Sequence, residues 1–165
     1  MFAKAMAPVD AHDPVFFGLL STSFFRLLGR ELIPDAAVRK EDEAFQALWL
    51  YQHAPFCVLA HDTQADPMFT YANCAAQHCF GYAWEEIIRL PSRLSAEAPE
   101  RAERQRLLDA VTGNGFIENY RGVRIAKTGQ RFWIENAVVW QLRDEAGGLH
   151  GQAAMFQPPR NGTGP

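Results

Sequence analysis

The chain has 165 residues, 48% of them hydrophobic, including 12 Phe, 4 Trp and 4 Tyr, and its net charge is −3. This length suits one domain, and the apolar content is sufficient for a buried core. The acidic balance argues against the clustered basic face of nucleic-acid-binding proteins. No stretch approaches the roughly 20 apolar residues of a membrane span. We therefore expect one globular domain without a nucleic-acid or membrane partner.

The two ends of the chain and its cysteines indicate the compartment and the domain limits. The amino terminus lacks a continuous apolar run with a small-residue cleavage site, so we expect a cytoplasmic protein. Three cysteines are an odd number without a Cys-x-x-Cys pair, which favours free thiols. We expect a flexible leader over residues 1–12, a single domain over 13–157 and a disordered tail over 158–165.

Two helices are predicted first. Asp13-Pro14 is an N-cap followed by proline at the first helical position, and Gly29 is a plausible stop, which gives a helix over 14–29. This helix contains four phenylalanines. A second helix is predicted over 41–53, and Pro34 separates the two.

From Pro55 onward the spacing of the apolar residues no longer fits long helices and instead indicates strands and short helices. Strands are predicted in "PFCVLAHD", "PMFTYAN", "GFIENYRGVRIAK", "QRFWIENAVVWQLRD" and "LHGQAAMFQ", with a turn at Thr128-Gly129. Short helices follow the second strand, and a longer helix covers about 100–111. The predicted class is α+β: a five-stranded antiparallel sheet with helices on one face, preceded by the two N-terminal helices.

The longer helix carries charges of both signs. Arg101, Arg104 and Arg106 lie among Glu and Asp residues, a pattern typical of a solvated helix face. The pair Glu85-Glu86 begins a short helix, where negative charge is favourable. Neither feature predicts a site.

The order of the elements and the turn residues between them resemble a PAS domain. In this comparison "FTYANCAAQHCFGYAWEEI" corresponds to the second strand, the first helix and the "GY-x-x-E-E" signature. "KTGQRFWIENAVVWQLRDEAGGLHGQAAMF" resembles the closing hairpins of that family. With the N-terminal helices included, residues of about 14–157 resemble the MEKHLA domain, a PAS-like family of stand-alone bacterial proteins and of certain plant homeodomain transcription factors. Segments such as "LLGREL" and "LPSRLSAE" carry this likeness, although the hexapeptide that names the family does not occur. The resemblance implies a sensory or interaction role.

The light-sensing branch of PAS domains has a cysteine that attacks a flavin ring, within "GRNCRFLQ". The corresponding stretch here is "RLPSRLSA", which places Ser92 at the cysteine and Pro91 at the preceding asparagine. Arg124 and Ile134 stand where that branch usually presents asparagines to the flavin. Because a hydroxyl is far less acidic than a thiol, adduct-forming flavin chemistry is not expected. Haem is weakly supported, since the longer helix contains no histidine. The cofactor stays unknown.

Cysteines and histidines are the remaining candidates for chemistry. Cys74, His78 and Cys79 lie in one short helix, but a structural zinc site usually takes four ligands from paired motifs. Packing as small apolar side chains is the favoured reading of both cysteines. Cys57 with His61 or His53 does not form a nucleophile and base pair, because a strand separates these side chains. No catalytic motif is present, so no enzyme is predicted.

The inner face of the sheet is the predicted ligand site. Strict alternation in the fourth strand places one set of side chains on a single face: Phe132, Ile134, Asn136, Val138, Trp140 and Leu142. The last strand places Gln152 with Ala154 and Phe156. An apolar wall with a few amides is typical of a small-molecule pocket. The predicted ligand-binding residues are Asn136, Gln152, Trp140, Ile134 and Tyr71.

Alternatives remain open at each of these positions. Asn136 and Gln152 either satisfy each other in a packed sheet or contact a ligand, and Asn73 is read mainly as an N-cap. Tyr71, Trp133 and Tyr120 either line the pocket or cover the opposite face. The first functional hypothesis is a sensory module for a small molecule, with output through a partner or a homodimer. The second is an interaction domain without a ligand, which dimerises through the apolar N-terminal helix.

Overall fold

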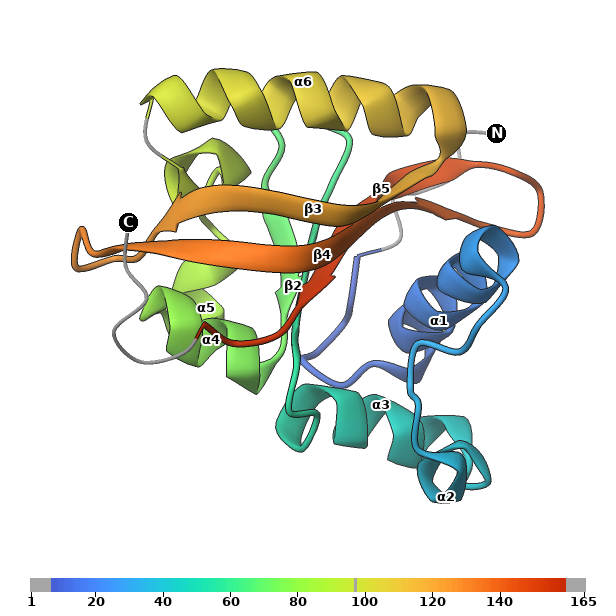
Figure 1. Cartoon of the computed structure of the whole chain (residues 1–165). Coiled ribbons are helices and arrows are strands. Elements are labelled where there is room, and N and C mark those ends of the chain that lie inside the picture. The colour runs from blue at the N-terminus through green and yellow to red at the C-terminus, as the bar shows by residue number, and fades with distance from the viewer. Residues whose placement is uncertain (1–6, 97, 160–165) are drawn as a thin grey trace.

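The computed structural model describes residues 7–96 and 98–159, without the side chains at 98–100. Five strands form one antiparallel sheet in the order β2-β1-β5-β4-β3 (Figure 1). The strands are β1 (Cys57–His61), β2 (Phe69–Ala72), β3 (Phe116–Ile125), β4 (Arg131–Arg143) and β5 (Leu149–Phe156). The five predicted strands and the fold class are therefore confirmed. Residues 1–6 of the expected leader and 160–165 of the expected tail lie outside the described residues.

The helices include both that were predicted at the N-terminus. They are α1 (Pro14–Leu28), α2 (Ala36–Arg39), α3 (Glu43–Gln52), α4 (Cys74–Phe80), α5 (Trp84–Ile87) and α6 (Ala98–Asn114), with a 3-10 turn η1 (Ser92–Ser95). Asp13 caps α1 by accepting from the Val15 amide, and Gly29 ends it in the left-handed conformation. Among the described helices, none combines the length and the apolarity needed to cross a bilayer.

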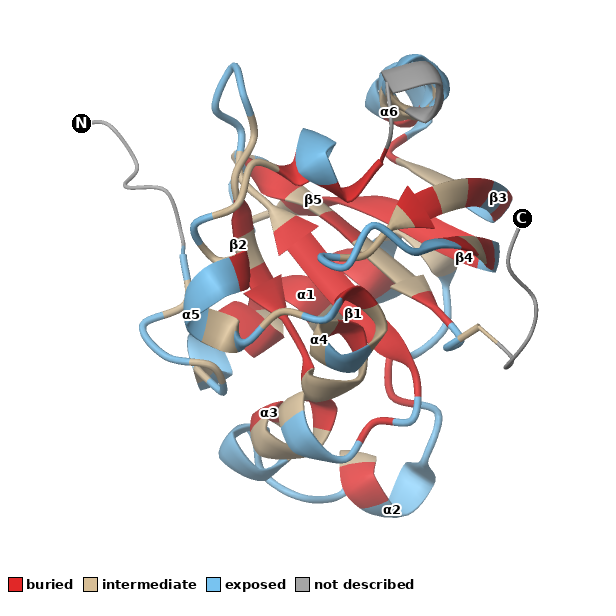
Figure 2. Cartoon of the chain, turned by 90° about the vertical axis from the view of Figure 1, so that its left-hand side faces the viewer, coloured by how far each residue is buried: buried red, intermediate tan, exposed pale blue. Residues whose placement is uncertain are grey.

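The sheet separates two hydrophobic cores. On one face α1 packs against side chains of β1 and β4, including Val58 and Trp140. On the other face α4, α5 and α6 cover side chains such as Leu59 and Val139. Figure 1 shows α6 and α1 on opposite sides of the sheet, and Figure 2 shows the strands between them as mostly buried. The predicted layer of helices covers one face of the sheet, and in addition α1 covers the other face.

The backbone at Asn136 decides which β4 side chains face which core. Asn136 has a φ of 51° and its side chain is exposed. Asparagine tolerates this left-handed conformation, which inserts a bulge and reverses the alternation of the side chains that follow. Ile134 therefore faces the α6 side, whereas Trp140 and Leu142 face α1. The expectation that these residues share one face with Asn136 was wrong, because strict alternation ends at a bulge.

Asn73 ties three elements together, and its predicted role as an N-cap is confirmed. Its side-chain oxygen accepts from the Ala76 amide of α4 and from the Val58 amide of β1. Its amide nitrogen donates to the carbonyls of Leu50 and Phe56. The residue is 0% exposed, so these four hydrogen bonds satisfy a buried amide completely.

Replacing Asn73 with aspartate is expected to lower the free energy of unfolding by about 2–4 kcal/mol, because a carboxylate cannot donate to the two buried carbonyls. Urea unfolding monitored by circular dichroism measures the loss. The matched control is Asn136→Asp at the exposed bulge, expected to change stability by less than about 0.5 kcal/mol. Equal effects of the two substitutions would contradict the role assigned to Asn73.

Candidate functional site

A cavity lies between the sheet and α6, on the face opposite α1. It measures about 620 Å³, including space open to solvent, and its lining is mostly apolar. Every strand contributes to it, together with α4, α6 and η1. The lining residues are Leu59, Ala60, His61, Phe69, Phe80, Ser95, Arg104, Leu107, Leu108, Val111, Tyr120, Arg124, Ile134, Val139, Gln152, Ala153, Ala154 and Phe156.

Helix α6 brings a cation into this apolar wall. Arg104 precedes Leu107, Leu108 and Val111 by three, four and seven residues, so all four lie on one side of the helix and line the cavity. The Arg104 side chain is partly buried and donates to Ser92 Oγ at 2.9 Å. The reading of Arg104 as part of a solvated face was therefore wrong. In the sequence, the spacing of three, four and seven residues from Arg104 to Leu107, Leu108 and Val111 indicates that Arg104 lies on the apolar side of the helix.

Strand β3 supplies a second arginine to the same cavity. Tyr120 and Arg124 share the inner side of the strand, and Arg124 is only 7% exposed. Its guanidinium donates to the Tyr120 hydroxyl at 2.9 Å and to the Val123 carbonyl at 2.8 Å. Gly122 lies between them, and a Cβ there would meet the Tyr120 hydroxyl at 2.5 Å. Glycine is therefore required for the tyrosine to lie across the strand and reach Arg124.

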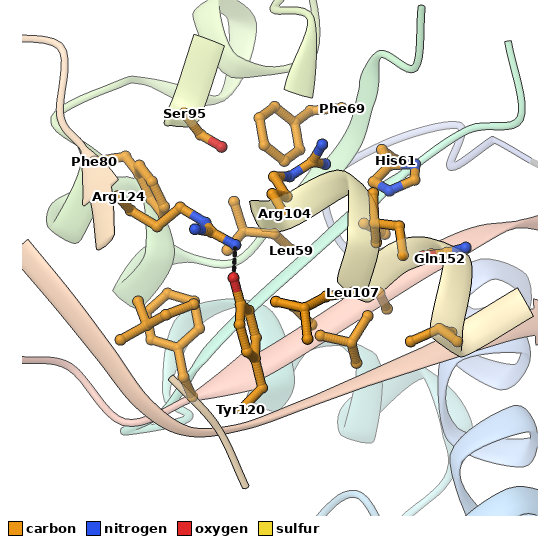
Figure 3. A pocket seen from close by; sticks show the side chains of 18 residues that line it. Leu59, His61, Phe69, Phe80, Ser95, Arg104, Leu107, Tyr120, Arg124 and Gln152 are labelled. Atoms are coloured by element: carbon orange, nitrogen blue, oxygen red, sulfur yellow. Dashed lines mark hydrogen bonds between the residues drawn. The ribbon is translucent and has the colours of Figure 1, made fainter. Parts of the chain in front are cut away.

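The two guanidinium groups lie close enough to repel each other. Burial and, as a smaller contribution, the charge of Arg124 lower the pKa of Arg104 to about 10, so Arg104 remains positive at neutral pH. In Figure 3 the Arg104 side chain lies between Arg124 and His61. Among the residues whose side chains the structure describes, no acidic one lines the cavity, and no carboxylate lies within ion-pair distance of either arginine.

His61 and Gln152 form the other end of the polar lining (Figure 3). The His61 Nδ1 lies 2.9 Å from the Asp62 carbonyl, which can only accept, so Nδ1 carries the proton and Nε2 is an acceptor. Burial lowers the pKa of His61 to about 4, so the ring is neutral at pH 7. The side-chain oxygen of Gln152 is buried without a hydrogen-bond partner among the described residues.

The structure brings two of the five predicted ligand-binding residues to this cavity. Ile134 and Gln152 line it, and Asn136 is exposed on the bulge. Trp140 lies on the α1 face, where its indole nitrogen donates to the Leu20 carbonyl. Tyr71 is on that face too, packed against α1 and α5. Asn136, Trp140 and Tyr71 therefore do not meet Ile134 and Gln152 in one pocket. The bulge turns the β4 side chains that follow it to the other face of the sheet, and Tyr71 points away from the cavity toward α1.

Further residues of the cavity were not among the predicted site. Arg104, Arg124, His61 and Tyr120 provide most of its polar groups. Of the three aromatic residues left open, Tyr120 lines the cavity and Tyr71 faces α1. Trp133 stacks outside the cavity against Arg121, 3.8 Å from ring centre to guanidinium carbon.

The cysteines meet in a pair that the sequence did not indicate. Cys57 Sγ lies 3.3 Å from Cys79 Sγ, and both side chains belong to the core on the α6 side of the sheet. Cys57 is fully buried, so it remains a thiol and donates to Cys79. That hydrogen bond lowers the pKa of Cys79 and raises the pKa of Cys57. His78 is exposed and does not join this pair.

Two candidate cofactors, a metal ion and an adduct-forming flavin, each need particular side chains. Within the described ranges, no group of three or more His, Cys, Asp or Glu side chains is arranged to hold a metal ion. Ser92 is fully buried, and its hydroxyl accepts from Arg104. A serine there cannot supply the thiolate that forms a flavin adduct, so the residues present do not fit that reaction.

The comparisons with known proteins agree on the fold. The family model for the MEKHLA domain matches residues 15–158. No curated protein sequence is similar enough to match the chain. Among solved structures, a PAS domain from Colwellia psychrerythraea is 18% identical with a TM-score of 0.59, over 71% of this chain and 97% of that one.

Two light-oxygen-voltage proteins are also similar in structure. An RNA-binding light-oxygen-voltage receptor is 21% identical with a TM-score of 0.57, over 78% of this chain and only 35% of the receptor. A light-oxygen-voltage domain studied with a flavin analogue is 17% identical with a TM-score of 0.56, over 75% of this chain and 89% of that domain. At these identities the likeness establishes the PAS fold.

The free energy of unfolding is expected to fall as the pH is lowered from about 6.5 to 4. The unfolded chain binds a proton at His61 in that range, whereas the depressed pKa keeps the folded ring neutral, so the unfolded state gains. His61→Gln should remove about 2–3 kcal/mol of this loss, as measured by urea unfolding at pH 7 and pH 4.5. The control is His78→Gln on the exposed side of α4, which should retain the wild-type dependence. If His61→Gln also retained it, the buried neutral ring would be contradicted.

Cys57→Ala is expected to raise the pKa of Cys79, because the substitution removes the thiol that donates to it. The pH at which iodoacetamide labels Cys79 at half its maximal rate, followed by peptide mass spectrometry, should move upward. Cys57→Ser keeps a donor and serves as the control, with labelling close to that of the wild type. Identical profiles for wild type and Cys57→Ala would disprove the hydrogen bond.

Proposed function

The chain belongs to the MEKHLA domain family, and on that premise we propose that it is a PAS-like sensory module that binds a small molecule between the sheet and α6. The observation that carries the proposal is the cavity, an apolar hollow with a few converging polar side chains. This is the usual composition of a small-molecule site. The proposed role is binding, and no catalytic step is assigned to any residue.

The two faces of β4 support a route from the cavity to α1. Val139 lines the cavity, and the next residue, Trp140, is fully buried against α1. The Trp140 indole donates to the Leu20 carbonyl at 3.2 Å and packs edge-on against Phe24, with 5.0 Å between ring centres. Because the two residues share a peptide unit, a ligand that displaces Val139 also displaces Trp140. The signal then reaches the helix on the far side of the sheet.

We place the output at a partner or at a second copy of the chain. Three of the four phenylalanines of α1 are buried on the protein's own sheet, which leaves Phe25 at 50% exposure and Val15 at 63%. This exposed strip is smaller than the sequence led us to expect. It also supports the alternative function, an interaction domain that works without a ligand. Sedimentation velocity of wild type and Phe25→Glu separates the two: a ligand-independent dimer lost on substitution favours the alternative.

Binding in the cavity is tested by blocking it. Ala154 lines the cavity on β5, so Ala154→Phe should fill it, whereas Ala110→Phe adds the same ring on the exposed side of α6. The probes are indole, benzamide and phenylacetate, followed by amide chemical shifts of labelled protein. At least one probe should cause saturable shifts at Leu59, Ile134 and Ala153 in the wild type and Ala110→Phe. In Ala154→Phe these shifts should weaken at least tenfold.

Native mass spectrometry of freshly purified protein supplies the second measurement. A bound molecule that is retained by Ala110→Phe and lost from Ala154→Phe would support the sensory module. If only the bare chain appears, and if no probe shifts the cavity amides, the proposed function is wrong.

A further inference from the structure

We propose that the cavity selects a small organic acid, with the carboxylate between Arg104 and Arg124 and an apolar body against the sheet. This inference rests on the proposed function and adds the chemical class of the ligand. It starts from two like charges placed together in an apolar hollow without a counter-charge from any described residue.

Most hydrogen-bond donors of the two arginines are not used by the protein. A guanidinium has five N–H donors. Among the described residues, the hydrogen bonds of Arg104 go to Ser92 alone, and those of Arg124 go to Tyr120 and Val123. The remaining donors lie in a setting where unpaired charge is costly. An anion between the two groups would accept from both and would cancel their repulsion.

The rest of the lining determines what the anion carries. Beyond the arginines, the walls consist largely of aliphatic and aromatic side chains from β1, β4 and α6, such as Leu59, Ile134 and Leu107. A bare inorganic anion would leave these walls without a partner, whereas a hydrocarbon body would cover them. The carboxylate is the anion that matches a forked guanidinium while adding little bulk.

Gln152 is an independent observation that points to a ligand. Its side-chain oxygen is buried and has no donor among the described residues, although such an atom normally has one. His61 Nε2, in the tautomer set by the Asp62 carbonyl, is a second acceptor in the lining. Arginines at one end and acceptors at the other favour an acid that also carries a hydroxyl or N–H donor.

The test compares acids with amides of the same shape. Butyrate, hexanoate and phenylacetate are each titrated by calorimetry beside butyramide, hexanamide and phenylacetamide. At least one acid should bind wild type ten or more times tighter than its amide, because charge-assisted hydrogen bonds are about twice as strong as neutral ones. Inorganic phosphate is the anion without an apolar body, and it should bind more weakly than the best acid.

Arg104→Met supplies the matched substitution, since it keeps an apolar stem and removes the charge. It should weaken the acid at least tenfold and leave the amide unchanged, while Arg106→Met on the exposed side of α6 should change neither. Without ligand, Arg104→Met should keep or raise the melting temperature, by up to about 4 °C, because it removes repulsion between like charges. A marked fall would make Arg104 a structural residue and overturn the assignment.

The outcomes separate the two proposals. If the amides bind as tightly as the acids, the organic-acid inference is wrong while small-molecule binding stands. If phosphate binds and the acids do not, the apolar body is wrong. If none of these probes binds and native mass spectrometry shows the bare chain, the sensory function itself fails. The comparison of acid with amide uses wild-type protein, so it holds even if Arg104→Met does not fold.

Discussion

The left-handed backbone at Asn136 is the constraint on which both cores of the protein depend. A single strand, β4, must supply apolar side chains to α6 on one face of the sheet and to α1 on the other. Before the bulge, Ile134 faces the cavity. After it, Val139 faces the cavity and Trp140 faces α1. Without the bulge, the indole would be directed into the cavity and α1 would lose the contacts of Trp140 with Leu20 and Phe24, because a shift of one residue exchanges the two faces of a strand.

The cavity between these elements is mostly apolar, yet two positively charged side chains line it. Two arginines occupy a lining to which the described residues contribute no acidic side chain, and burial lowers the pKa of Arg104 to about 10. Such an arrangement does not stabilise the fold, since like charges in a partly buried site repel each other. Natural sequences depart from the rules of stable packing mainly at functional sites. The charges, the shape of the hollow and the buried oxygen of Gln152 would share one explanation in the ligand recognition that we propose.

The α1 helix connects that site to the rest of the molecule. Its buried face covers the sheet directly behind the cavity, and Trp140 anchors it through a hydrogen bond to Leu20. The helix thus completes the core on its face of the sheet. It also contacts Trp140, which is joined by one peptide unit to Val139 in the cavity lining. A strand that contributes to both cores is well placed to couple them, because packed side chains cannot move independently of the backbone they share.

Local signals in the sequence determined the elements of this protein. Asp13-Pro14 and Gly29 set the ends of α1, Asn73 set the start of α4, and short apolar runs between turn signals marked the five strands. These features depend on neighbours in the chain, so they can be read from it. Only the tertiary structure decided which side chains meet in the cavity. The bulge at Asn136 is set by how β4 pairs with β3, and the burial of Arg104 is a property of the space between α6 and the sheet. Contacts of this kind form between residues distant in sequence. A local pattern such as the spacing from Arg104 to Val111 places side chains on one face of a helix, but it does not say what that face meets.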